Sequence, residues 1–90
     1  MRGRIVVSAL LPEAIAAGLV REGFDVVDSG AADAAVVTLG ELPLHGVRVV
    51  AVAAADEVVT AFAVGADDVV TPRIDPKELA ARLDAILRRR

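Results

Sequence analysis

The segment Ala61–Leu79, AFAVGADDVVTPRIDPKEL, decides the fold, because it passes from the end of one helix through a strand into the start of another. Gly65 is a typical helix stop, and the run Asp68–Thr71 suits a short buried strand. Asp75 precedes Pro76, which is the order expected for an N-cap followed by the first helical residue. Helix, strand and helix in close succession predict a domain of the α/β class.

The rest of the chain repeats this alternation. Its apolar runs are rich in Val and Ile and nearly continuous, as in parallel strands that are buried on both faces. The five predicted strands are Arg4–Val7, Asp25–Val27, Ala34–Leu39, Arg48–Ala53 and Asp68–Thr71. The three predicted helices are Pro12–Glu22, a segment from the N-cap Asp56 to Gly65, and a segment that begins at Asp75 and carries the apolar stripe Leu79, Leu83, Ile86 and Leu87.

Two of the connections between strands contain no helix. The segment Asp28–Asp33 is only long enough to span roughly 20 Å when fully extended, so it can return to the start of a parallel strand only if the flanking strands are short. An antiparallel hairpin at this point is the alternative. The segment Gly40–Val47 is long enough to return as an irregular loop.

Composition excludes several classes of protein. The 90 residues suffice for one small domain, and we expect a single domain over residues 1–90. The net charge of −3 gives no general attraction to nucleic acid, and the absence of cysteine excludes disulfides and thiolate metal sites. We find neither a signal peptide nor an apolar run long enough to span a membrane, so the expected location is the cytoplasm.

The segment Gly65-Ala66-Asp67-Asp68 and the segment Asp75–Leu79 resemble the closing part of the receiver domains of response regulators. The resemblance extends more loosely to the first half of the chain. It implies a flavodoxin-like parallel sheet of five strands in the order 2-1-3-4-5, here with three helices and two connections that lack a helix.

The same resemblance locates the positions at which receivers carry out phosphoryl transfer. Ser8 and Ala9 stand where receivers have the acidic pair that holds Mg²⁺, and Thr38 stands where they have the phosphoacceptor aspartate. Ala53 replaces their serine or threonine, and Pro72 replaces their lysine. A hard cation needs oxygen ligands, and phosphoryl transfer needs that cation and fixed positive charge. We therefore expect a vestigial pocket with no metal, no cofactor and no enzymatic activity.

The loss of two helices suggests how such a module works. One face of the first three strands would expose Val, Ile and Ala side chains, and an apolar patch of that size usually marks an interaction surface. We therefore expect a regulatory module that acts through protein association, as a homodimer or with a dedicated protein partner, without phosphorylation. The chain is either freestanding or part of a longer regulator. In a rival arrangement, the Gly40–Val47 loop covers the gap within a monomer.

A second function class stays open from the sequence. The chain is alternatively a small-molecule-binding module that uses the carboxyl ends of its strands, the usual ligand crevice of open α/β sheets. The polar groups expected there are Ser8, Thr38 and Thr71.

Overall fold

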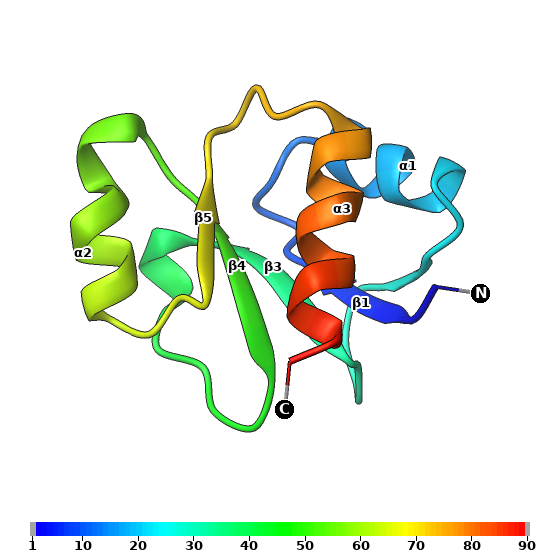
Figure 1. The fold of residues 1–90 in the computed structure, drawn as a ribbon, viewed down its shortest axis with the longest axis horizontal. Coiled ribbons are helices and arrows are strands. Elements are labelled where there is room, and N and C mark those ends of the chain that lie inside the picture. Colours follow the sequence, from blue (N-terminus) through cyan, green and yellow to red (C-terminus); the bar gives the residue numbers. More distant parts are fainter. Residues whose placement is uncertain (1, 90) are drawn as a thin grey trace.

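All five strands lie in one parallel sheet in the computed structural model, which describes residues 2–89 (Figure 1). The strands are β1 (Arg4–Val7), β2 (Asp25–Val27), β3 (Ala34–Thr38), β4 (Arg48–Val52) and β5 (Asp68–Val70). Their order is β2-β1-β3-β4-β5, and every neighbouring pair is parallel. The predicted flavodoxin-like α/β sheet is thus confirmed. The alternative prediction, an antiparallel hairpin between the second and third strands, is wrong, because both strands pair with β1 in parallel.

Within residues 2–89, three α-helices and two 3₁₀ turns accompany the strands, and the last helix follows β5. They are α1 (Glu13–Arg21), η1 (Leu39–Glu41), η2 (Ala55–Glu57), α2 (Val58–Ala63) and α3 (Pro76–Leu87). The predicted N-cap of α3 is confirmed, since the Asp75 carboxylate accepts the Lys77 N–H at 2.8 Å. The predicted N-cap Asp56 is wrong, because it lies inside η2. Glu57 instead accepts the N–H of Ala54 at 3.0 Å.

The larger core lies between the sheet and the pair α1 and α3, which pack side by side on one face (Figure 1). Its fully buried large side chains include Ile5, Leu19, Leu79, Leu83 and Ile86. The two helices approach closely where Gly18 of α1 meets Pro76 of α3. A Cβ atom at position 18 would lie 2.7 Å from the Pro76 Cγ, so only glycine allows this approach.

The opposite face of the sheet has a thinner covering. Helix α2 packs small residues, Ala61 and the following Ala66, against Ala51 of β4. Residues 39–47, which we call the cover segment, lie over the middle of the sheet. From this segment Leu42 and Val47 pack on the buried cluster of Ala35, Val37 and Val49.

The expected bare face over the first three strands is therefore wrong for β3, where Ala35 and Val37 are only 3% and 4% exposed. The chain shields β3 with its own loop, as in the rival arrangement predicted from the sequence. The side chains of Val6 in β1 and Val27 in β2 stay half-buried. The incompletely covered part of this face is therefore smaller than predicted and lies over β1 and β2.

The connection from β2 to β3 passes over β1 on this same face. Its residues Gly30–Ala32 border a hollow of about 410 Å³ together with Val6 and Ala35. At the end of the connection, Asp33 is fixed to β1 by two hydrogen bonds: its N–H donates to the Arg4 carbonyl at 2.8 Å, and its carboxylate accepts the Arg4 N–H at 2.8 Å. The crossover fits because β2 has only three residues. No helix formed by the described residues has both the length and the apolar character that a bilayer-spanning helix requires.

Candidate functional site

The carboxyl ends of β1 and β3 bring Ser8 and Thr38 to the same edge of the sheet. Both strands are parallel neighbours, and the Ser8 N–H donates to the Val36 carbonyl at 2.9 Å. After Ser8 the chain turns toward α1, and the Leu10 N–H donates to the Ser8 Oγ at 3.1 Å. The two hydroxyl side chains therefore face the region where an open α/β sheet usually binds its ligands.

A carboxylate from the chain itself occupies the space between these two residues. The Glu41 side chain, at the end of η1, accepts the Ser8 hydroxyl at 2.8 Å through Oε1. Its Oε2 accepts the Thr38 N–H at 2.7 Å and the Thr38 hydroxyl at 2.9 Å. Glu41 thus links the ends of β1 and β3, and its three hydrogen bonds have charge-assisted geometry.

These contacts also set the protonation of Glu41. Burial raises the pKa of Glu41, but the Thr38 N–H, the Ser8 hydroxyl and the Thr38 hydroxyl lower it by more. The resulting pKa lies below the ordinary value of a glutamate, because hydrogen bonds that donate to a carboxylate favour its charged form. Glu41 is therefore a stable negative charge at neutral pH.

The other predicted site positions do not join this cluster. Ala9 is exposed, and Ala53 is buried with its N–H bonded to the Val70 carbonyl at 2.9 Å. Thr71 and Pro72 are exposed and line separate hollows, Thr71 beside α3 and Pro72 between α1 and α3. Of the six predicted positions, the structure thus brings only Ser8 and Thr38 together.

The sequence prediction does not include Glu41 in the site, because Glu41 falls in the predicted irregular loop Gly40–Val47. The available signal was the spacing Thr38-Leu39-Gly40-Glu41, because a threonine followed three residues later by glutamate is typical of a helix start. Glu41 does reach back to the Thr38 N–H in the way this motif requires. Its bond to Ser8 joins residues 33 positions apart and follows only from the tertiary structure.

The donor set around Glu41 limits the chemistry of this edge. Both carboxylate oxygens already accept hydrogen bonds from neutral donors. Across residues 2–89, no three His, Asp or Glu side chains come together in a way that could hold a metal ion. The arrangement is suited to fixing η1 in place.

Next to Ser8, a groove of about 520 Å³ runs between α1 and the carboxyl ends of β1 and β2. Most of its lining residues are apolar, and the acidic residues Glu13 and Asp28 also line it. It is lined by Val7, Ser8, Ala9, Leu11, Pro12, Glu13, Ala16, Val26, Val27 and Asp28. This groove is the place at which the carboxyl edge could accept a small molecule.

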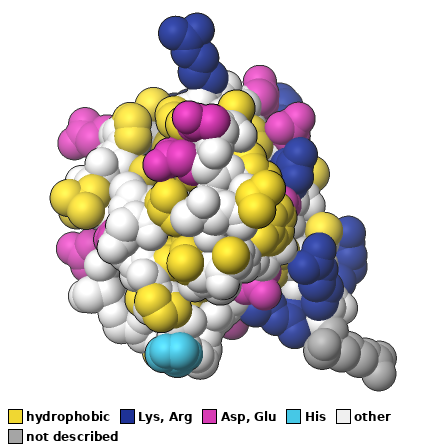
Figure 2. Space-filling view, turned by 90° about the vertical axis from the view of Figure 1, so that its left-hand side faces the viewer, with side chains coloured by type: hydrophobic (Ala, Val, Ile, Leu, Met, Phe, Trp, Pro, Cys, Tyr) yellow, Lys and Arg dark blue, Asp and Glu magenta, His cyan; other side chains and the backbone are white. Residues whose placement is uncertain are grey.

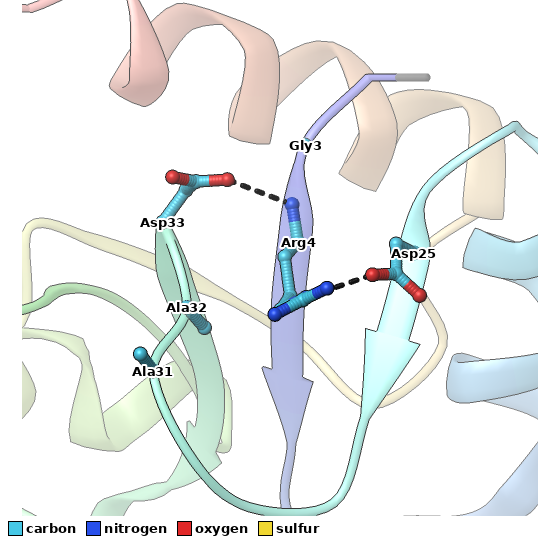
Figure 3. Close-up of a pocket in the computed structure, with 6 residues that line it drawn as sticks. All are labelled: Gly3, Arg4, Asp25, Ala31, Ala32 and Asp33. Carbon is cyan, nitrogen blue, oxygen red and sulfur yellow. Dashed lines mark hydrogen bonds and ion pairs between the residues drawn. The ribbon is translucent and has the colours of Figure 1, made fainter.

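At the opposite edge of the sheet, Arg4 lies between two aspartates (Figure 3). Its Nε donates to the Asp25 carboxylate at 2.8 Å, while its backbone N–H donates to Asp33. The hollow around these residues measures about 460 Å³. Because both carboxylates hold neighbouring strands to the start of β1, we assign this cluster a structural role.

Asp67 and Asp68, at the start of β5, have a comparable structural role. The Asp67 carboxylate accepts the Val49 N–H at 2.7 Å, and its own N–H donates to the Val49 carbonyl at 2.8 Å. Asp68 pairs with Arg82 at 3.1 Å. The contacts of Asp67 fix the start of β5 beside β4, and the ion pair of Asp68 joins β5 to α3.

Neither a protein-family model nor a curated protein matches this chain.

Proposed function

We propose that this chain is a receiver-like signalling module that acts through protein–protein association and neither carries out nor requires phosphoryl transfer. The observation that carries the proposal is the position of Glu41, whose carboxylate fills the space between Ser8 and Thr38 at the carboxyl edge of the sheet. A receiver would need an acidic pair, a metal ion and a lysine in this region. Here the side chains at those positions are uncharged, as Ser8, Thr38 and Pro72 illustrate.

Electrostatics supports the same conclusion. A phosphoryl donor would approach a fixed negative charge at Glu41, and no described metal-binding cluster offsets that charge. Phosphoryl transfer depends on positive charge that stabilises the transferring group. The edge that transfers phosphate in receivers is thus electrostatically unsuited to the reaction in this chain.

The association is supported by the outer surface of α2. Val59 is 82% exposed and Phe62 is 48% exposed, and Val64 lies close behind them at 37%. We call these three residues the α2 face. Figure 2, which looks onto the side of the molecule that carries α2, shows apolar side chains gathered over this side with acidic groups above them. Exposed apolar groups at helical spacing are typical of a docking surface.

We assign a second copy of the chain as the partner, paired through the thinly covered side of the sheet that bears the α2 face. A twofold pairing is the commonest arrangement of homo-oligomers, and it would place the Phe62 side chains of two copies near one axis. The site of action is the cytoplasm in this proposal.

Two measurements test the proposal. The first is intact-mass spectrometry after incubation with acetyl phosphate and Mg²⁺, in which we expect no added phosphoryl group. The second is sedimentation equilibrium over a wide range of concentrations, in which we expect a dimer that F62S weakens. The matched control is V20S, since Val20 is an equally apolar and exposed residue of α1 on another side of the molecule. A phosphorylated product would refute the first half of the proposal, and a monomer at all concentrations would refute the second.

The groove beside Ser8 supports one alternative function, the binding of a small apolar or cationic molecule between α1 and the ends of β1 and β2. Its test is a thermal-shift screen with small amphiphilic cations, since a ligand that binds only the folded state raises the melting temperature. Ala16 lines this groove, so A16L, which would fill it, should abolish the thermal shift and leave dimerisation unchanged.

A further inference from the structure

The cover segment is attached to the rest of the molecule unevenly. At its first end, Glu41 makes the three hydrogen bonds to Ser8 and Thr38. Among the described residues, no side-chain hydrogen bond or ion pair involves residues 42–47. The polar attachment of the segment is therefore concentrated in one side chain.

The apolar attachment of the segment rests on three side chains. Leu39 and Leu42 pack on the cluster that contains Ala51, and Leu42 and Val47 pack on the cluster that contains Val37. Between them, residues 43–46 are all exposed. A segment with few buried side chains and few hydrogen bonds opens at a lower free energy than the core.

The length of the cover segment allows it to lift away while the sheet stays paired. Its nine residues, from Leu39 to Val47, can span about 30 Å when extended. A return along the five-residue strand β4 requires about 16 Å. The hollow of about 410 Å³ beside Leu44 and Val47 already separates the segment from β1 on one side.

We propose that the cover segment is an autoinhibitory lid on the sheet, latched by the contacts of Glu41 with Ser8 and Thr38, and that its release exposes Ala35, Val37 and Val49 for association. This inference rests on the proposed function, because it describes how the same side of the sheet becomes available to a second copy. With the lid closed, this side of the sheet offers the α2 face for docking. The open lid adds the apolar surface of β3 and β4 beside it.

The chain contains no cysteine, so a single introduced thiol reports on the opening of the lid. V37C places the thiol beneath the lid, and V36C places it on the other face of the sheet beneath α1 and α3. The rate of modification by a small aromatic disulfide, divided by the rate for free cysteine, is measured for both in increasing urea. We expect V37C to react at least about tenfold faster than V36C, with a weaker dependence on urea, because its exposure requires only local opening.

The role of the Glu41 contacts is then tested by adding further substitutions to the V37C and V36C variants. E41Q should raise the V37C rate about tenfold again, a ratio that corresponds to about 1.4 kcal/mol. S8A, a milder change that removes one donor to Glu41, should raise it about threefold. I86V in α3 is the matched control: it weakens the core that the open and closed states share, so it should raise the V36C rate and leave the V37C rate unchanged. Equal rates and equal urea dependences for the two thiols, or a V37C rate that neither E41Q nor S8A changes, would overturn the proposal.

Sedimentation equilibrium of E41Q separates this inference from the proposed function. If E41Q exposes the V37C thiol and also shifts the monomer–dimer equilibrium toward the dimer, both are supported. If the thiol is exposed and the equilibrium does not move, the lid stands and association through this side of the sheet is refuted. If the wild-type chain dimerises but E41Q changes neither measurement, association stands and the lid is refuted.

Discussion

Gly18→Ala should destabilise the protein, although the same change inside a helix is ordinarily favourable. Alanine exceeds glycine in helix propensity by about 1 kcal/mol. At position 18, however, the new Cβ would lie 2.7 and 2.8 Å from two ring carbons of Pro76. Carbon atoms pack at about 3.5–4.0 Å, so α1 and α3 would have to separate by about 1 Å. Pro76 cannot turn aside, because its ring is rigid and the Asp75 cap fixes the first turn of α3.

Overpacking typically costs about 1–3 kcal/mol, and a contact with a rigid ring should cost about 2–3 kcal/mol. The net loss of stability should therefore be about 1–2 kcal/mol once the gain of about 1 kcal/mol in propensity is subtracted. Urea-induced unfolding followed by circular dichroism measures it, since the chain has no Trp or Tyr for fluorescence. A17G at the neighbouring exposed position measures the propensity difference in the same helix, about 1 kcal/mol. P76G, which removes both contacting ring carbons, should make the cost of G18A smaller than it is in the wild-type background. A G18A variant that is as stable as the wild type, or more stable, would refute the reasoning.

Three further outcomes follow from single contacts. The folded state lowers the pKa of Glu41, so the contribution of Glu41 to stability is complete above the pKa of an unfolded glutamate and is lost as the pH falls through the lowered value. The difference in free energy of unfolding between wild type and E41Q, about 1 kcal/mol after allowance for partial exposure, should therefore shrink toward acid pH in urea unfolding experiments. A difference that stays constant with pH would contradict the assignment. D67A should cost about 1–2 kcal/mol in the same assay because it leaves the Val49 N–H without its acceptor, whereas D56A, which removes no described hydrogen bond, should cost less than 0.5 kcal/mol. D75A should lower stability by about 1 kcal/mol through loss of the α3 cap, and D75N, which keeps a capping oxygen, should recover most of that loss.

The strands could be predicted from the sequence to within one residue at each end. Their apolar runs are nearly continuous, and this pattern is strong when both faces of a sheet are buried. The start of α3 was equally clear, because Asp75 and Pro76 satisfy the backbone of the first turn locally. Such features depend only on neighbours in the chain.

The features that the sequence did not reveal depend on residues far apart in the chain. Asp56 looks like an N-cap, but the 3₁₀ turn η2 begins first and Glu57 takes the capping contact. The burial of Ala35 and Val37 depends on where Leu42 lies in space, and loop conformation is not encoded by hydrophobic periodicity. Glu41 joins the candidate site only because β1 and β3 are neighbours, although strand β2 lies between them in the sequence.

The short connection that crosses β1 also bears on how the chain folds. Because only the residues Asp28–Asp33 separate β2 from β3, closing this loop costs little chain entropy once β2 has paired with β1. Pairing of β2 with β1 therefore brings β3 close to the other side of β1. Asp33 then holds the start of β3 there through its two hydrogen bonds to Arg4. We therefore expect β1, β2 and β3 to assemble together, and β4 and β5 to add to the sheet afterwards.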